Sequence, residues 1–203
     1  MKNLKVVSLF DGISCARLAL KRAKCQVGAY YSSEIDKYAI EISKKKWPEI
    51  IQLGDIKKLK ISKPLRWYGI DLVIGGSPCQ DLSIAKNNRQ GLKGERSGLF
   101  YEYVRVLNEA KPRYFILENV ASMPQDAKDS ISKELWGIKP MMINAALVSA
   151  QQRKRLFWIG KWNGKEYEQV HIEQPKDKGI LLKDILLDGD TDDLKSLCIT
   201  ASY

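Results

Sequence analysis

Short apolar segments alternate with amphipathic segments along most of the chain. The short segments are rich in β-branched and aromatic side chains, which predicts buried strands, while apolar positions that recur every three or four residues predict helices. We expect strands at residues 4–10, 27–34, 71–76, 113–120, 141–150 and 155–162. We expect helices at residues 16–23, 37–47, 98–111 and 126–137, with Ser14 capping the first of them.

Strands that alternate with helices in this way require crossover connections, which are right-handed and join parallel strands. The sequence therefore predicts an α/β fold with a mostly parallel sheet and helices on both faces. The alternation supports one domain at residues 1–163. From Gly164 the periodicity weakens, and the acidic run at 188–193 is typical of a solvated turn or connector, so we expect residues 164–203 to form a connector.

Composition indicates a globular protein with one main domain. The 203 residues are 44% hydrophobic and 29% charged, which excludes both a disordered chain and a membrane protein. No apolar run approaches the ~18 residues that cross a bilayer, and no secretory signal is present, so we expect a cytoplasmic protein without a membrane partner. Four scattered cysteines and a single histidine, His171, argue against a disulfide framework and against a bound metal.

The net charge of +10 leaves two interpretations open. An excess of Lys and Arg on one face favours binding to a polyanion such as nucleic acid, because neutralised phosphates release their counterions. A basic surface that only keeps the protein soluble would have the same composition. Charge alone does not decide between them.

Three polar motifs follow predicted strands: FDG (10–12), SPC (77–79) and EN (118–119). In open α/β sheets, ligands bind beyond the carboxyl ends of the strands. The three motifs are therefore expected to lie at one binding edge.

Cys79 is the candidate nucleophile at this edge. A thiol attacks as its thiolate, and a free cysteine with a pKa of ~8.5 is little ionised at neutral pH, so catalytic thiols lie where backbone amides or cations stabilise the anion. A tight turn shaped by Gly75, Gly76 and Pro78 would provide that setting with few side chains in the way. The alternative is a buried, inert cysteine.

Charged side chains in two later strands are candidates to assist the thiol. Glu118 ends a predicted strand, where a partly buried carboxyl could hold or share a proton near neutrality, although an ordinary capping or ion-paired glutamate fits the same pattern. Arg153 and Arg155 stand at alternate positions entering the last predicted strand, so both guanidinium groups should project from one face. Two solvated arginines on a surface strand are the alternative.

Four motifs in this order resemble the C5-cytosine-specific DNA methyltransferase family: LFDG (9–12), GGSPCQDLS (75–83), ENV (118–120) and QQRKRLFWIG (151–160). The likeness covers nearly the whole chain. Within the family, the segment SPCQDLSIAKNNRQGL (77–92) is similar to bacterial and phage enzymes as well as to the animal de novo type. The resemblance implies the Rossmann-like fold of S-adenosylmethionine-dependent methyltransferases. It also implies transfer of a methyl group from S-adenosylmethionine to C5 of cytosine in double-stranded DNA, with S-adenosylhomocysteine as the product.

The resemblance assigns roles to the candidate catalytic residues. Cys79 would add to C6 of cytosine, which makes C5 reactive toward the methyl group. Glu118 would hydrogen-bond or protonate N3, and Arg155 would hold O2 of the base. Arg153 would support the site, and Asn119 would orient the glutamate loop.

A cytosine inside a duplex cannot reach a thiol, so the family extrudes the base, at a cost of about a few kcal/mol. The polar segment 80–97 follows Cys79 and includes Gly91 and Gly94, which fits a mobile basic loop that closes over DNA. Its candidate DNA contacts are Gln80, Ser83, Lys86, Arg89, Lys93 and Arg96. A merely flexible surface loop is the alternative.

The resemblance also places the cofactor at the ends of the first strands. The turn after the first strand would approach the methionine part through Phe10, Asp11, Gly12, Ile13 and Ser14, where Ser14 stands in place of the family's second glycine. Glu34 matches the acid expected on the ribose hydroxyls, and Asp55 matches the acceptor of the adenine amino group. The expected apolar neighbours of the rings are Ile35, Ile56 and Leu99.

Family members continue with a target-recognition region and a closing segment, and neither is found in this sequence. We therefore expect an incomplete catalytic core that binds the cofactor weakly and methylates poorly by itself. A second polypeptide carrying the recognition region would be its partner, and the chain is otherwise expected to be a monomer. Two further functions stay open: methylation of cytosine in transfer RNA, which Pro-Cys-Gln disfavours, and a non-catalytic DNA-binding subunit, which the catalytic side chains disfavour.

Overall fold

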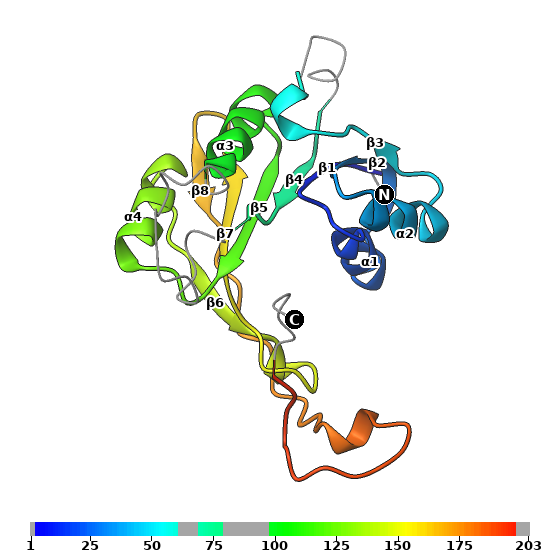
Figure 1. Ribbon diagram of the computed structural model, residues 1–203. Helices are drawn as coiled ribbons and strands as arrows, with labels where there is room; N and C mark the ends of the chain where they lie inside the picture. Colours follow the sequence, from blue (N-terminus) through cyan, green and yellow to red (C-terminus); the bar gives the residue numbers. More distant parts are fainter. Residues whose placement is uncertain (1–2, 61–68, 79–97, 198–203) are drawn as a thin grey trace.

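The computed structural model describes residues 3–60, 69–78 and 98–197 (Figure 1). The strands are β1 Leu4–Leu9, β2 Val27–Ser33, β3 Ile51–Gln52, β4 Leu72–Gly75, β5 Tyr114–Val120, β6 Met141–Asn144, β7 Lys154–Trp162 and β8 Tyr167–Gln169. The α-helices are α1 Cys15–Arg22, α2 Lys37–Lys46, α3 Leu99–Ala110 and α4 Gln125–Glu134. Short 3₁₀ helices are η1 Ile56–Lys58, η4 Ala145–Leu147 and η5 Lys183–Ile185.

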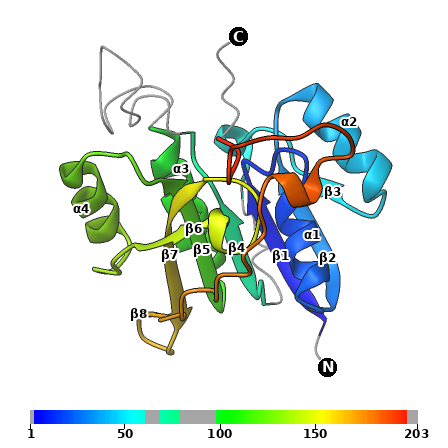
Figure 2. The ribbon, with the colours of Figure 1, turned by 90° about the horizontal axis from the view of Figure 1, so that it is seen from below.

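The strands form one sheet in the order β3-β2-β1-β4-β5-β7-β6, and β8 pairs with β7. Neighbouring strands from β3 to β5 are parallel, whereas β7 runs antiparallel to both β5 and β6. Figure 2 shows β1, β4, β5 and β7 side by side. The order reverses between β1 and β4, which is the switch point where ligands bind in open α/β sheets. The predicted α/β fold, a mostly parallel sheet with helices on both faces, is confirmed.

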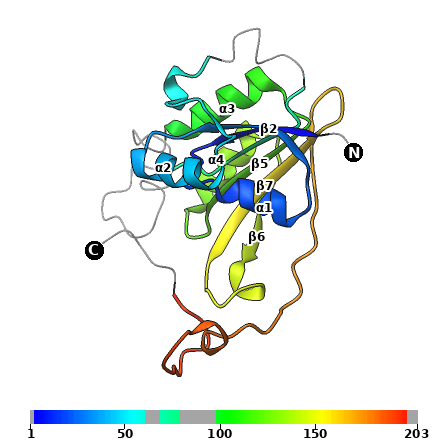
Figure 3. The same ribbon diagram turned by 90° about the vertical axis from the view of Figure 1, so that its right-hand side faces the viewer.

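Alternation along β1 separates the two layers of helices. Val7 and Leu9 belong to the core cluster that includes α3 and α4, whereas Val6, which precedes Val7, belongs to a second cluster with Tyr30 and Trp47. Consecutive strand residues point to opposite faces, so one strand serves both cores. Figure 3 shows α1 and α3 on opposite sides of the sheet.

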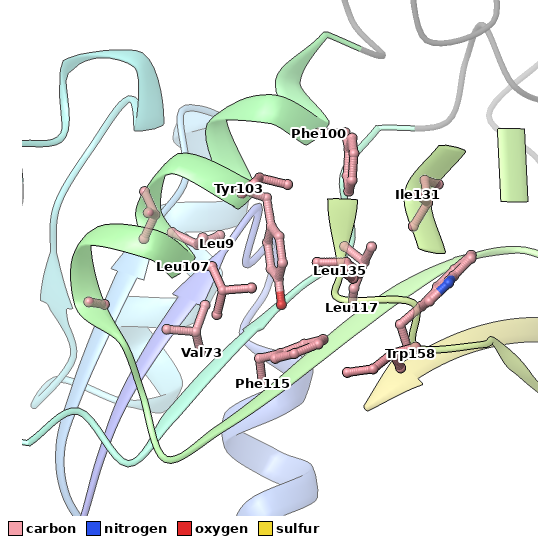
Figure 4. Close-up of a cluster of buried hydrophobic side chains, with 14 of the residues drawn as sticks. Leu9, Val73, Phe100, Tyr103, Leu107, Phe115, Leu117, Ile131, Leu135 and Trp158 are labelled. Carbon is pink, nitrogen blue, oxygen red and sulfur yellow. The ribbon is translucent and has the colours of Figure 1, made fainter. Parts of the chain in front are cut away.

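Helix α3 supplies much of the larger core because its apolar residues recur at helical spacing. Phe100, Tyr103 and Leu107 are fully buried on one side of the helix and face Leu117 of β5 and its neighbours (Figure 4). Burying a large apolar side chain contributes about 1.5–3 kcal/mol. This packing fixes the start of α3, at Leu99, against the carboxyl ends of the central strands.

The sequence predicted the positions of the main helices and strands but misplaced some ends. The predicted strand at 141–150 ends at Asn144, where the Asn144 side chain accepts a hydrogen bond from the Ala146 N–H at 3.1 Å and η4 begins. Strands β3 and β8 were not predicted, since two or three residues give no periodic signal. Neighbouring strands, not local sequence, stabilise them.

The segment after β7 carries little regular structure. Strand β8 pairs with β7 and extends the sheet to Gln169, and η5 is the last helical turn among the described residues. The predicted boundary at residue 163 stays a prediction. In the part of the chain that the structure describes, no helix is long and apolar enough to cross a membrane.

Candidate active site

The carboxyl ends of four adjacent parallel strands bring the polar motifs together. Strand β1 leads into residues 10–14, β2 into Glu34, and β4 into residues 76–78. Strand β5 ends with residues 118–120, next to the start of β7. As expected from the sheet direction, the described residues of the three motifs therefore share one edge.

The turn after β1 has an unusual backbone. Phe10, Gly12 and Ser14 have φ values of 56°, 56° and 62°, which lie in the left-handed region. Glycine adopts this conformation freely, whereas a residue with a Cβ pays about 1 kcal/mol. Ser14 thus has a left-handed backbone conformation that glycine would adopt more easily, which agrees with the glycine usual at this position in the family.

The Ser14 side chain does not cap α1. The prediction of a Ser14 cap is therefore wrong. Ser14 is the residue directly before the helix, but no hydrogen bond joins its hydroxyl to the helix backbone. Its Oγ instead lies 2.6 Å from Asp11 Oδ2 and 2.6 Å from Ser43 Oγ of α2. A tertiary contact that local sequence does not show has replaced the cap.

Asp11 holds the turn in this shape. Its carboxylate accepts hydrogen bonds from the hydroxyls of Ser8 at 2.5 Å, Ser14 at 2.6 Å and Tyr30 at 2.7 Å. Burial, followed by the charge of Asp11, raises the pKa of Tyr30 above its ordinary value, so Tyr30 stays a hydrogen-bond donor at neutral pH. The buried Asp11 carboxylate is directed into this network.

Glu34 links the turn after β1 to the turn after β2. Its Oε2 accepts the Gly12 N–H at 2.7 Å, and its Oε1 accepts the N–H groups of Ile35 at 2.7 Å and Asp36 at 2.9 Å. A carboxylate has about four lone-pair sites, so these bonds leave capacity for ligand hydroxyls. The backbone thereby fixes the Glu34 carboxylate beside the cavity described next.

A cavity of about 400 Å³ lies at this edge, and such a volume suits a small organic ligand. It is lined by Phe10, Ser33, Glu34, Ile35, Asp55, Ile56, Lys57, Gly76, Pro78 and Leu99. The structure thus brings together six predicted cofactor residues, namely Phe10, Glu34, Ile35, Asp55, Ile56 and Leu99. The remaining candidates, Asp11, Gly12, Ile13 and Ser14, lie outside the cavity lining.

Four lining residues were not predicted as cofactor contacts. Gly76 and Pro78 belong to the turn that the sequence had marked only as the setting of Cys79, and Lys57 directly follows Ile56. Ser33 ends β2, where its hydroxyl donates to the Gly54 carbonyl at 2.7 Å. The only sequence signal that could have identified these four residues was their closeness along the chain to residues that were predicted.

Glu118 and Arg155 form an ion pair next to this cavity. Arg155 Nε lies 2.8 Å from Glu118 Oε1, and the side chains are 19% and 33% exposed, respectively. A Cβ added to Gly76 would lie 2.8 Å from Glu118 Oε2. Gly76 therefore adjoins both the cavity and the carboxylate, and only a residue without a side chain allows the two to approach so closely.

Asn119 of β5 is buried on the face of the sheet opposite to Glu118. Its Nδ2 lies 3.4 Å from both the carbonyl oxygen and the Oγ of Ser77, and its Oδ1 accepts the Val120 N–H at 2.8 Å. Asn119 thus contacts the turn that leads to Cys79. The glutamate loop was the expected contact.

Arg153 precedes β7, and its backbone closes the turn that follows β6. The Arg153 N–H donates to Asn144 Oδ1 at 3.1 Å, and its carbonyl accepts the Ala145 N–H at 3.0 Å. The prediction that Arg153 and Arg155 project from one face of a strand is therefore only partly met, because the strand begins at Lys154. Cys79 and the predicted DNA contacts, Gln80, Ser83, Lys86, Arg89, Lys93 and Arg96, lie outside the described residues.

Comparison with known proteins identifies the family. The model of the C-5 cytosine-specific DNA methylase family matches residues 4–200. The chain belongs to this family. The predicted resemblance is therefore confirmed, and with it the Rossmann-like methyltransferase fold.

Individual members of the family agree with this assignment. The chain is 34% identical over 171 residues to an orphan methyltransferase, M.Rho11sI, of Bacillus phage rho11s, covering 79% of this chain and 33% of that protein. It is 32% identical over 200 residues to the Type II methyltransferase M.NgoPII of Neisseria gonorrhoeae, covering 91% of this chain and 57% of that enzyme. A crystal structure described as a DNA modification methyltransferase encoded within an E. coli prophage matches with a TM-score of 0.62 and 26% identity, covering 78% of this chain and 47% of that one.

This family member spans only part of the length of these relatives, between 33% and 57% of the two curated ones. The matched part includes the first strand, the cavity and the Glu118–Arg155 pair. The activity of the whole protein is a separate proposal.

Proposed function

We propose that the protein transfers a methyl group from S-adenosylmethionine to C5 of cytosine in double-stranded DNA. The observation that carries this proposal is the position of Gly76. Gly76 lines the cavity, adjoins the Glu118 carboxylate, and stands three residues before Cys79. A cofactor in the cavity and a base held by Glu118 would therefore meet beside the thiol.

The residues of the cavity fit S-adenosylmethionine. Glu34, fixed by three backbone N–H groups, can accept from the ribose hydroxyls, and Asp55 can accept from the adenine amino group. Ile35, Ile56 and Leu99 give apolar surface for the adenine ring. When bound there, the cofactor supplies an electrophilic methyl group.

The remaining residues act on the base. The Cys79 thiolate adds to C6, and the electron density that this places on C5 enables C5 to accept the methyl group. Glu118 hydrogen-bonds or protonates N3, which stabilises the charge on the ring, while Arg155 fixes the Glu118 carboxylate and approaches O2. A base then removes the C5 proton. The electrons of the C5–H bond form the C5–C6 double bond, and the C6–S bond breaks to release the Cys79 thiolate.

DNA is the substrate that the chain's charge and family support. The net charge of +10 favours a polyanion, and the Lys and Arg residues at 86–96 belong to the segment that follows the nucleophile. Base-specific contacts require side chains that reach base edges, whereas phosphate contacts mainly position the protein. We propose that a further region, in the same or a second polypeptide, supplies those contacts, since the relatives are longer than the matched part.

Covalent trapping tests the chemistry. A duplex containing 5-fluorocytosine is incubated with the protein, an added recognition region and S-adenosylmethionine. A base can remove a proton from C5 but cannot remove fluorine, so the covalent adduct persists. We expect an adduct that resists denaturation and is absent from Cys79→Ala. Trapping by Cys79→Ala, or trapping of 5-fluorocytosine transfer RNA in preference to the duplex, would contradict the proposal.

The three candidate functions give different results in this experiment. A transfer RNA methyltransferase would trap the RNA substrate, and a non-catalytic subunit would bind DNA without forming an adduct in the presence or absence of an added recognition region. Cofactor binding is measured separately, by calorimetric titration of S-adenosylhomocysteine at high protein concentration.

A further inference from the structure

Arg105 occupies the middle of α3 and connects this helix to η1. Its guanidinium donates from Nε to Glu102 Oε2 at 2.8 Å and from Nη1 to Glu109 Oε1 at 3.0 Å. Its Nη2 donates to the backbone carbonyl of Ile56 at 2.8 Å. All three nitrogen atoms of the guanidinium are therefore engaged, and one of them holds a backbone group 49 residues away.

The residue held in this way belongs to the wall of the cavity. Ile56 lines the cavity and is buried, and Asp55 before it caps η1 by accepting the Lys57 N–H at 2.9 Å. Helix α3 reaches the same cavity through its first residue, Leu99. Arg105 thus joins two chain segments that line the cavity, from a position behind the wall.

The two glutamates restrict where the guanidinium can lie. Glu102 and Glu109 stand three residues before and four residues after Arg105, which places both carboxylates on the same side of the helix. The guanidinium is planar and presents its donors in a fixed fork, so binding two carboxylates determines the direction of the third arm. A lysine ammonium, a single point charge on a flexible stem, cannot reproduce this arrangement.

Short segments such as η1 need such support. A 3₁₀ helix of three residues has few internal hydrogen bonds, and in η1 these are Lys58 N–H to the Asp55 carbonyl at 3.0 Å and Leu59 N–H to the Ile56 carbonyl at 3.1 Å. The Ile56 carbonyl accepts from both Leu59 and Arg105. Without Arg105, the Ile56 carbonyl would keep only the bond from Leu59, and the packing of the Ile56 and Leu59 side chains in the core would be the main remaining restraint on η1.

We propose that Arg105 is a positioning residue that fastens η1 to α3 and so presets Asp55 and Ile56 for the adenine end of the cofactor. This inference rests on the proposed function, because it assigns the cavity to S-adenosylmethionine. Arg105 lies outside the cavity lining and acts through the Ile56 carbonyl. Its removal should therefore weaken cofactor affinity and leave the chemistry on the base intact.

The test compares Arg105→Met and Arg105→Lys with the wild-type chain and with Arg22→Met, which removes an exposed arginine at the end of α1. Titration of S-adenosylhomocysteine should give a dissociation constant raised about 10-fold or more in both Arg105 variants, the size expected for losing a hydrogen bond to a charged group. In the trapping reaction, the S-adenosylmethionine concentration that gives half the maximal trapping rate should rise, while the maximal trapping rate stays within about 2-fold. Arg22→Met should match the wild type.

Hydrogen exchange separates positioning from general destabilisation. The amides of Lys58 and Leu59 should exchange faster in Arg105→Met, while amides in the middle of β1 and β5 keep their protection. The milder variant Glu109→Gln, which leaves the arginine in place, should change the dissociation constant in the same direction by a smaller factor. Faster exchange throughout the sheet would overturn the assignment.

The outcomes also distinguish this inference from the proposed function. If the wild type binds S-adenosylhomocysteine and Arg105→Met binds equally well, the positioning role is wrong and the proposed function stands. If the wild type and all variants fail to bind, the cavity is not the cofactor site, and both proposals fall.

Discussion

Arg155 Nε lies 2.8 Å from Glu118 Oε1, across two neighbouring antiparallel strands. The register of β5 and β7 pairs Val120 with Arg155 and Glu118 with Phe157, so Glu118 and Arg155 are diagonal neighbours on one face of the sheet. The same register directs Asn119 to the other face, where it contacts Ser77. The antiparallel insertion of β7 thus brings a guanidinium to the carboxylate that borders the cavity.

Replacing Arg155 by Met tests the function of this pair. Glu118 would lose the group that fixes its orientation, and we expect the rate of adduct formation on a 5-fluorocytosine duplex to fall by about 10²–10³-fold, as for other preorganised charge contacts. Because both side chains are partly exposed, the free energy of unfolding should change by no more than about 1 kcal/mol. Lys154→Met, at an exposed neighbouring position, is the control. An unchanged rate in Arg155→Met would rule out a catalytic contribution from the pair.

Replacing Gly76 by Ala tests whether the cavity and the carboxylate must approach closely. The new Cβ would lie 2.8 Å from Glu118 Oε2, closer than real Cβ contacts allow, so the carboxylate or the turn must move. We expect adduct formation to slow by at least about 10-fold, since small displacements at a reacting centre are costly. Gly28→Ala, whose Cβ would meet the side chain of Asn3 at 2.8 Å, is the matched control. Equal rates in wild type and Gly76→Ala would show that the turn adapts without cost.

Much of this arrangement could be predicted from sequence, because hydrophobic periodicity encodes buried strands and helices directly. The position of the ligand-binding edge could be predicted because parallel strands all end at the same edge of the sheet. The predicted residues Glu34, Asp55 and Leu99, far apart in sequence, do line one cavity. Local patterns were sufficient for the strands, the helices and the edge, whereas the cofactor residues were assigned by the resemblance to the methyltransferase family.

The features that sequence did not predict depend on contacts between distant residues. The hydroxyl of Ser14 binds Asp11 and Ser43 rather than capping its helix, because a buried carboxylate offers a stronger partner. Likewise, no local signal indicates that β7 inserts between β5 and β6, or that Arg105 reaches the Ile56 carbonyl. Register and tertiary hydrogen bonds determine these features, and they are absent from any single segment.

Lys195 should anchor the segment that follows β8. Its Nζ donates to the carbonyls of Ala146 at 2.9 Å and Ser149 at 3.1 Å, and also to the Ile180 carbonyl. In Lys195→Met these carbonyls lose a charged donor, and we expect the local stability of residues 180–196 to fall by about 1–3 kcal/mol. The measurement is hydrogen exchange at the Leu182 and Ser196 amides, which bond to the Leu194 and Ala150 carbonyls, respectively.

The control for Lys195 is Lys183→Met, which removes an exposed lysine from η5 in the same segment. Its exchange rates should match those of the wild type, because charge alone contributes little at an exposed position. Equal protection of Ser196 in wild type and Lys195→Met would mean that backbone pairing with residues 150–152 suffices to hold the segment.

Tyr30 should make stability fall at alkaline pH. Burial and the Asp11 charge raise its pKa in the folded state, so above the ordinary tyrosine pKa of about 10 the unfolded chain loses a proton that the folded protein retains. The free energy of unfolding then decreases as pH rises, by up to about 1.4 kcal/mol per pH unit for one such group. Below pH 10 both states keep the proton, and this contribution does not vary.

Urea unfolding of wild type and Tyr30→Phe between pH 8 and 11 measures this contribution. Tyr30→Phe should be less stable at pH 8, because Asp11 loses a hydrogen bond, yet its stability should fall less steeply above pH 10. Some slope will remain, since burial also raises the pKa of Tyr103 and Tyr167. The exposed Tyr38, replaced by Phe, should leave the wild-type slope unchanged. If Tyr30→Phe retains the full slope, the Tyr30 proton is not held by the Asp11 network, and the alkaline loss must come from the other buried tyrosines.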